Sequence, residues 1–257
     1  MQSDRIALSI VIPVKNEVEN ILSLAVEIGS VFEKEPIEWE CIWIDDGSTD
    51  GSLAALCGLS EADPRHRYVS FAENAGQSAA FWAGFNEARG EMIATIDGDG
   101  QNDPADLPTL TRMVRTGQAD MVNGYRIRRK DNLKRKLTSF VANSFRTLMT
   151  GKTVRDVGCS TRVFRRECIA ELPRFSGMHR FLPTLVAMRG FRLAEVPVNH
   201  RPRLRGKSKY SINNRLWIGL IDTFGVIWLK KRAFRYRIKL RSGYENQPSE
   251  TMKADQA

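Results

Sequence analysis

The sequence contains few of the residues that build disulfide frameworks or zinc sites. Its 257 residues include four cysteines and three histidines. No two cysteines have C-x-x-C spacing, and no histidine cluster accompanies them; they are Cys41, Cys57, Cys159 and Cys168. The N-terminus also lacks a basic segment followed by an apolar one, the pattern of a secretory leader. We therefore expect reduced, mostly buried thiols in a protein of the cytosol.

Long apolar runs are also missing. No segment reaches the about eighteen apolar residues that are needed to span a bilayer. The nearest is residues 216–229, which is shorter and contains Asp222. There is no internal repeat, and 42% hydrophobic with 27% charged residues is ordinary for a globular protein. We expect one α/β domain over residues 1–215 and a small C-terminal extension.

Acidic residues are scarce in one region. Residues 201–241 contain thirteen Lys or Arg and one acid, Asp222, although the net charge of the whole chain is only +9. The positive charge is therefore local, and it lies beside an apolar segment that contains tryptophan. Since no reading helix, zinc spacing or stacking-sheet motif accompanies it, we expect no nucleic-acid partner.

The chain does contain a repeated alternation of apolar strands and amphipathic helices. Residues 8–14 and 40–44 are continuous apolar runs, and residues 17–32 between them have apolar residues at helical spacing. The same alternation predicts strands at residues 68–71, 92–96 and 120–123, and helices at residues 78–89, 107–116 and 133–149. Such uniformly apolar runs are typical of a parallel sheet that is covered by helices on both faces. The prediction is an α/β fold with an open, mostly parallel sheet.

Polar clusters follow four of the predicted elements. They are KNE at residues 15–17, DDGS at 45–48, NAGQ at 74–77 and DGD at 97–99. Each cluster alone is compatible with a turn or a helix cap, but ligands of open α/β sheets bind at the carboxyl ends of the strands. Asp97 and Asp99, one residue apart after an apolar run, offer hard oxygen ligands for Mg²⁺ or Mn²⁺ shared with a diphosphate.

Several motifs together resemble the family-2 glycosyltransferases of the GT-A fold. They are IPVKNE, IDDGSTDGS, NAGQSAAFWAGF and IDGDGQNDP. Downstream, VRDVGCSTRVFRRE and GFRLAEVPVNHRPRLRGKSKYS resemble the branch that contains dolichol-phosphate mannose synthases and bacterial polyprenyl-phosphate sugar transferases. The resemblance covers about residues 8–215.

The resemblance implies a binding site for a nucleotide diphosphate sugar. The residues implied around the base and ribose are Pro13, Lys15, Glu17, Asp45, Asp46 and Asp97. Many mannose synthases carry an aromatic residue in place of Lys15, so the choice between GDP- and UDP-sugars stays open.

The resemblance also implies metal ligands and cationic catalytic residues. Asp97, Asp99 and Gln101 would hold the divalent metal and the donor diphosphate. Arg126, Arg203 and Lys209 would face the phosphates of donor and acceptor, and with Asp99 they form the implied catalytic set. The alternative is that residues 201–209 form a loop of solvated charges.

The implied activity is that of a metal-dependent glycosyltransferase, a hexosyltransferase similar to dolichyl-phosphate mannosyltransferase. It would transfer a sugar with inversion to a polyprenyl phosphate, undecaprenyl or dolichyl, at the cytoplasmic membrane face. A phosphate monoester acceptor is largely ionised at neutral pH and needs little help from a general base. One alternative is a saccharide or protein hydroxyl acceptor, for which Asp156 would be the base. Another is a non-catalytic nucleotide-sugar-binding subunit of a membrane complex.

The segment at residues 216–241 combines tryptophans with a cationic end. Trp217 and Trp228 lie in apolar sequence, and residues 230–237 are densely basic. This pattern favours a peripheral, in-plane contact with an anionic membrane on the cytoplasmic side, or a contact with a membrane protein. A core or dimer-contact helix is the alternative. Residues 242–257 are polar, and we expect a disordered tail.

Overall fold

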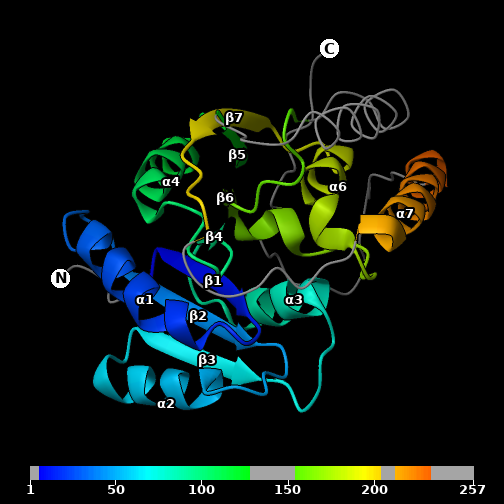
Figure 1. Cartoon of the computed structure of the whole chain (residues 1–257). Helices are drawn as coiled ribbons and strands as arrows, with labels where there is room; N and C mark the ends of the chain where they lie inside the picture. The colour runs from blue at the N-terminus through cyan, green and yellow to red at the C-terminus, as the bar shows by residue number, and fades with distance from the viewer. Residues whose placement is uncertain (1–5, 128–153, 204–211, 233–257) are drawn as a thin grey trace, which may run out of the picture.

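One seven-stranded sheet forms the centre of the molecule (Figure 1). The structure, a computed structural model, describes residues 6–127, 154–203 and 212–232, the last range without the side chains of residues 212–220. The strands are β1 (Leu8–Val14), β2 (Trp39–Asp45), β3 (His66–Ser70), β4 (Met92–Thr95), β5 (Met121–Arg126), β6 (Arg162–Arg165) and β7 (Leu193–Val198). Their order in the sheet is β3-β2-β1-β4-β6-β5-β7. The strands from β3 to β4 are parallel, β6 is antiparallel to β4 and β5, and β7 is parallel to β5.

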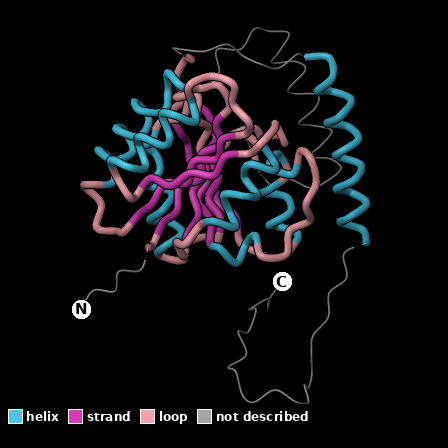
Figure 2. Tube along the Cα trace, turned by 90° about the horizontal axis from the view of Figure 1, so that it is seen from below, coloured by secondary structure: helices cyan, strands magenta, loops and turns pink. Residues whose placement is uncertain are grey.

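Helices cover both faces of the sheet (Figure 2). They are α1 (Val18–Phe32), α2 (Ser52–Ala62), α3 (Gln77–Glu87), α4 (Leu107–Arg115), α6 (Leu182–Met188) and α7 (Ile212–Arg232), with short 3₁₀ turns η1 (Pro104–Asp106), η2 (Arg166–Ile169) and η3 (Met178–Arg180). The core on one face includes residues of α1, α2 and α4, and the core on the other face includes residues of α3, α6 and α7.

Strand β1 shows why its sequence is uniformly apolar. Ile10 and Ile12 point into the core with α1, whereas Val11 points into the core with α3. All three are fully buried, and the one polar residue of the strand, Ser9, is buried too and donates its hydroxyl to Glu40. The predicted α/β fold with a mostly parallel sheet is confirmed.

Element boundaries differ from the prediction in a few places. Strand β3 begins at His66, two residues before the predicted start, and β5 extends to Arg126 instead of ending at residue 123. Helices α2 and α6 and strands β6 and β7 were not predicted. The predicted helix at residues 133–149 and the tail at 242–257 lie outside the described residues, and the boundary at residue 215 stays a prediction. Within the described ranges, no helix is long and apolar enough to cross a membrane.

Candidate active site

The loops that follow β1 and β2 contact each other at the carboxyl edge of the sheet. The backbone N–H of Asn16 donates to Ser48 Oγ at 2.8 Å, and the N–H of Thr49 donates to Asn16 Oδ1 at 2.7 Å. Asn16 has a positive φ of 49°, a conformation that asparagine tolerates better than most residues. The KNE and DDGS clusters therefore form one surface, to which Pro13 and the half-buried Lys15 belong.

Asp45 and Asp46 are buried and shape these loops through hydrogen bonds. Asp45 accepts from the Ser48 N–H at 3.0 Å and from Ser70 Oγ at 2.8 Å. Asp46 accepts from the N–H groups of the NAGQ loop, Ala75 at 2.7 Å and Gly76 at 3.0 Å. The two side chains join the ends of β2 and β3 to the start of α3.

Asp97 lies directly after β4 and is held by two neutral donors. Gln77 Nε2 donates to its Oδ1 at 2.8 Å, and Ser160 Oγ donates to its Oδ2 at 2.7 Å. Burial, together with the nearby charge of Asp99, raises the pKa of Asp97 to about 6. Gly98 lets this turn approach β1, because a Cβ there would lie 2.9 Å from the Pro13 carbonyl oxygen.

Asp99 forms an ion pair with a residue from the far end of the sequence. Arg203 Nη2 lies 2.6 Å from Asp99 Oδ2, and Arg203 Nη1 lies 3.1 Å from Glu17 Oε1. Residues 199–203 reach this position by pairing with the DGDGQN segment: Arg201 N–H donates to the Gln101 carbonyl at 2.8 Å, and Gln101 Nε2 donates to the Arg201 carbonyl at 3.2 Å. Residues of the β1, β4 and post-β7 loops thus converge on one charged cluster.

Arg126 stands at the end of β5 and pairs with Asp156. Its Nε and Nη2 atoms lie 2.7 and 2.9 Å from the two carboxylate oxygens, a bidentate geometry. Asp156, the general base that a hydroxyl acceptor would require, is thus engaged by a guanidinium.

The structure brings most of the predicted site residues to one edge of the sheet. Ion pairs join Glu17 and Asp99 to Arg203, and Gln101 pairs with Arg201 beside them. Asp97 lies two residues before Asp99 in the same turn, while Lys209 lies outside the described residues. Gln77 and Ser160, which donate to Asp97, were not predicted as site residues. Both lie within the motifs NAGQSAAFWAGF and VRDVGCSTRVFRRE, but spacing alone does not show which side chain faces the acid.

The site offers two carboxylates for a metal ion, which is fewer than a complete set of protein ligands. In the described part of the chain, no three His, Cys, Asp or Glu side chains are grouped so that they could hold a metal ion. Asp97 and Asp99 are the carboxylates of the DGD turn. Mg²⁺ commonly binds through one or two carboxylates and completes its coordination with substrate phosphates and water.

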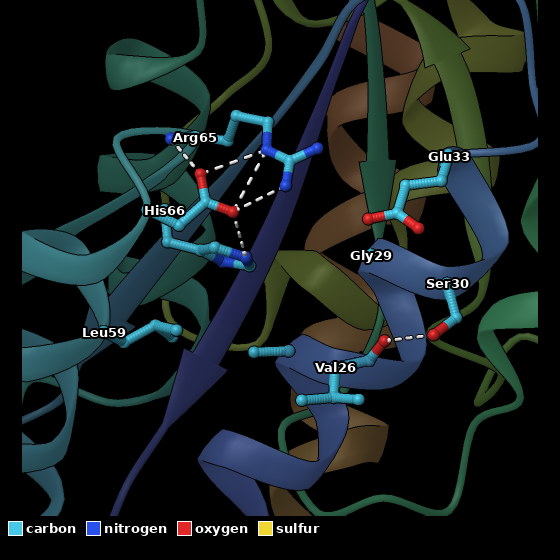
Figure 3. Close-up of a pocket in the computed structure, with 9 residues that line it drawn as sticks. Val26, Gly29, Ser30, Glu33, Leu59, Arg65 and His66 are labelled. Atoms are coloured by element: carbon cyan, nitrogen blue, oxygen red, sulfur yellow. Dashed lines mark hydrogen bonds and ion pairs between the residues drawn. The ribbon is translucent and has the colours of Figure 1, made fainter.

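A shallow pocket lies at the opposite edge of the sheet (Figure 3). Its lining includes Gly29 and Glu33 near the end of α1, and Arg65 and His66 at the start of β3. These positions lie at the amino ends of the parallel strands. The pocket is therefore separate from the cluster around Asp97.

Comparison with known sequences relates most of the chain to one family. The profile of the glycosyl transferase family 2 matches residues 9–172, more than half of the chain. The chain is 36% identical over 241 residues to the dodecaprenyl-phosphate galacturonate synthase of Rhizobium johnstonii, covering 92% of this chain and 69% of that protein. It is 38% identical over 204 residues to the undecaprenyl-phosphate 4-deoxy-4-formamido-L-arabinose transferase of Salmonella choleraesuis, covering 79% of this chain and 62% of that protein.

Solved structures share the fold at low sequence identity. Glucosyl-3-phosphoglycerate synthase from Mycobacterium tuberculosis, crystallised with Mn²⁺, uridine diphosphate and phosphoglyceric acid, superposes with a TM-score of 0.66 at 18% identity, covering 89% of this chain and 80% of that one. A mannosyltransferase from Pyrobaculum calidifontis in complex with GDP-mannose and Mn²⁺ superposes with a TM-score of 0.63 at 19% identity, covering 86% and 64%.

Proposed function

This chain belongs to glycosyl transferase family 2, and from that premise we propose that it transfers a sugar from a nucleotide diphosphate sugar to a polyprenyl phosphate. The observation that carries the proposal is the convergence of Asp97, Asp99 and Arg203 at the carboxyl edge of the sheet. The names of the two relatives above, which both act on polyprenyl phosphates, support the choice of acceptor.

The acids of the DGD turn fit a divalent metal, Mg²⁺ or Mn²⁺. Their oxygens are hard ligands, and the raised pKa of Asp97 reflects burial and a neighbouring negative charge that a cation would relieve. Asp97 and Asp99 would hold the ion, with Gln101 beside them. When bound, it supplies positive charge to the diphosphate that leaves with the nucleotide.

Basic side chains of the protein would bind the phosphates of donor and acceptor. Arg203 already lies between two acids, so it can exchange a carboxylate contact for a phosphate oxygen without moving far. Arg126 at the end of β5, and Lys209, are the further cations that we assign to the phosphates. Contacts that strengthen as negative charge builds on the leaving group stabilise the transition state more than the ground state.

The state of Asp156 favours a phosphate acceptor over a hydroxyl acceptor. Its two oxygens accept from Arg126, so it is a poor proton acceptor for a hydroxyl nucleophile. An ionised phosphate needs no such base. Its oxygen would attack the anomeric carbon directly, and a single displacement of this kind inverts the configuration.

The nucleotide base and ribose would lie over the loops of β1 and β2, among Pro13, Lys15, Glu17, Asp45 and Asp46. We propose a hexose or a hexose-derived sugar as the donor group, with mannose one member of the class. The names of the relatives add galacturonate as another member of this class, and a modified arabinose, a pentose, as a sugar outside it.

Helix α7 would bring the enzyme to its lipid substrate at the cytoplasmic membrane face. Val226 is buried in the core with α3, and Asp222 pairs with Arg180 at 3.3 Å, so these residues fix α7 to the body. The opposite side presents Phe224 and Trp228, whose exposed fractions are 55% and 61%. Three basic residues follow at the helix end, Lys230, Lys231 and Arg232. An apolar face beside basic residues fits an anionic membrane surface.

Transfer of labelled sugar into an organic phase tests the activity. Purified chain, Mn²⁺ and undecaprenyl phosphate are incubated with a panel of GDP- and UDP-sugars, and labelled lipid is extracted. We expect at least one donor to label the lipid and chelation by EDTA to stop the reaction. Labelled saccharide or protein without labelled lipid would contradict the proposed acceptor.

Flotation with anionic liposomes tests the membrane contact separately. We expect the wild-type chain to float with the vesicles at low salt and a Phe224→Ser/Trp228→Ser variant to remain in solution. The variant should keep its fold, because both side chains are largely exposed. Absence of the wild-type chain from the vesicle fraction at low salt would contradict the membrane contact.

A further inference from the structure

Two donors from different parts of the chain set the orientation of the Asp97 carboxylate. Gln77 is the first residue of α3, and Ser160 lies shortly before β6. Each donates to a different oxygen of Asp97. The direction in which this carboxylate faces therefore depends on how α3 and the segment before β6 are held relative to each other.

Arg162 is a buried arginine that holds this region together. Its exposed fraction is 3%, and its guanidinium makes three hydrogen bonds of 2.8 Å. Nε donates to Asn123 Oδ1 on β5, Nη1 donates to the carbonyl of His179 in η3, and Nη2 donates to the carbonyl of Val157. One side chain thus joins three segments that surround Asp97.

These bonds connect Arg162 to both donors. On one side, the Gly177 N–H donates to Ser78 Oγ at 2.9 Å, and Ser78 Oγ and His179 Nδ1 are hydrogen-bonded at 2.7 Å. Ser78 is the neighbour of Gln77 in the first turn of α3. On the other side, Val157 precedes Ser160 in the same short segment. The guanidinium therefore braces both arms that hold the acid.

Arg162 carries its positive charge at a buried position. A buried guanidinium is costly unless a carboxylate compensates it, and among the described residues no carboxylate forms an ion pair with Arg162. Burial lowers the pKa of Arg162, and the negative charges of Asp97 and Asp156 oppose this effect. The positive charge of Arg162 therefore lies near Asp97 and Asp156 without forming an ion pair with either carboxylate.

We propose that Arg162 is a positioning residue for sugar transfer, which fixes Gln77 and Ser160 on the two sides of Asp97 so that the carboxylate meets the donor in one orientation. The inference rests on the proposed function of the site. Arg162 makes no hydrogen bond to Asp97 or Asp99, and it acts through the residues that hold Asp97.

Arg166 provides a matched control. It also donates to backbone carbonyls, those of Ala88 and Gly90, and is half-buried. It follows the other end of β6, at the amino edge of β4, so its bonds do not reach Asp97. Its replacement should affect stability alone.

The experiment compares Arg162→Gln and Arg166→Gln in the full chain. For Arg162→Gln we expect kcat to fall by about 30-fold or more, with the KM for undecaprenyl phosphate changed by less than about threefold. Arg166→Gln should lower the temperature of unfolding and leave kcat unchanged. Equal kcat losses in the two variants, or a normal kcat in Arg162→Gln, would overturn the proposal. If Arg162→Gln is unfolded at the assay temperature, Arg162→Lys is measured in its place under the same criteria.

A double-mutant cycle tests whether Arg162 acts through Asp97. We expect Arg162→Gln/Asp97→Asn to be no slower than Asp97→Asn alone, because the orientation of the acid no longer matters once its charge is gone. Independent losses that multiply would contradict the inference. Binding of uridine or guanosine diphosphate with Mn²⁺ to the wild-type chain separates the two hypotheses: absence of both binding and transfer rejects the proposed function, whereas transfer with an unaffected Arg162 variant rejects only the positioning role.

Discussion

Glu40, which is buried, and Asp97, which is half-buried, lie at opposite edges of the same sheet, and their surroundings differ. Glu40 accepts from Ser9 Oγ at 2.7 Å and also forms an ion pair with Arg67 at 3.1 Å. Asp97 accepts from the neutral donors Gln77 and Ser160, and its nearest charged neighbour in the turn is another acid. The charge of Glu40 is compensated by an arginine of the protein. Asp97 is oriented by neutral donors and has no such ion pair among the described residues, so it can bind an external cation. This difference separates a structural carboxylate from a functional one better than burial does.

The largest effect should follow from removing Asp99. Asp99→Ala deletes a metal ligand and the partner of Arg203, and we expect transfer to fall by at least about 10³-fold because charge on the leaving diphosphate is no longer stabilised. Labelled-lipid extraction measures the loss, and circular dichroism checks the fold. Asp120→Asn, an acid before β5 at the amino edge, is the control and should retain activity. Unchanged turnover in Asp99→Ala would contradict the placement of the active site at the carboxyl edge.

Asp97→Asn should reduce activity by about 100-fold with little loss of stability. Burial and Asp99 raise the pKa of Asp97 to about 6, so its ionised form is held at a cost that a neutral amide avoids. Transfer rates and thermal unfolding at pH 7 measure the two effects. A fall in the unfolding temperature as large as that of Glu40→Gln would show that the two carboxylates are not different in kind.

Glu40→Gln should show the reverse pattern. The substitution leaves Arg67 without its buried partner, and we expect the free energy of unfolding to fall by about 2–3 kcal/mol. Urea unfolding gives this value, and kcat per folded molecule should stay at the wild-type level. A loss of kcat without a loss of stability would place function at the amino edge as well.

The smallest effect concerns His66, also at the amino edge. Trp43 Nε1 donates to His66 Nδ1 at 3.1 Å, and burial lowers the pKa of His66 below its usual 6.5. The folded state therefore favours the neutral ring. This contribution to stability is complete above pH 6.5 and is lost as the pH falls toward the lower pKa of the folded state, by up to about 1.4 kcal/mol per pH unit. Urea unfolding at pH 7.5 and pH 5.5 should show a smaller difference in His66→Gln. An equal change in the free energy of unfolding between the two pH values in both proteins would contradict this role of His66.

Regular apolar runs made the central strands predictable, and weak patterns hid the others. Strands β1 and β2 are buried on both faces, so their hydrophobic character is unambiguous. Helix α2 buries only Ser52 and Leu56, and β6 is four residues long and begins with a charged side chain, so neither has a clear period. Hydrophobic periodicity reports only on the element in which it occurs. Helix α2 and strand β6 are instead stabilised by the elements that pack against them.

The site was predictable to the level of its acids. Asp97 and Asp99 follow an apolar strand and were identified from that position. The pairing of Arg203 with Glu17 joins residues 186 positions apart, and no local pattern encodes such a contact; Arg203 was named only through the resemblance. The bracing by Arg162 was not foreseen, because a buried arginine in a short strand has no signature of its own.

The reversed direction of β6 bears on how this protein can diversify. Strand β5 ends at the carboxyl edge of the sheet, and an antiparallel neighbour starts at that same edge. Arg126 at the end of β5 and Arg162 at the start of β6 therefore come from adjacent strands to the same rim of the sheet. A change in the length of the connection between these strands need not shift the register of either one.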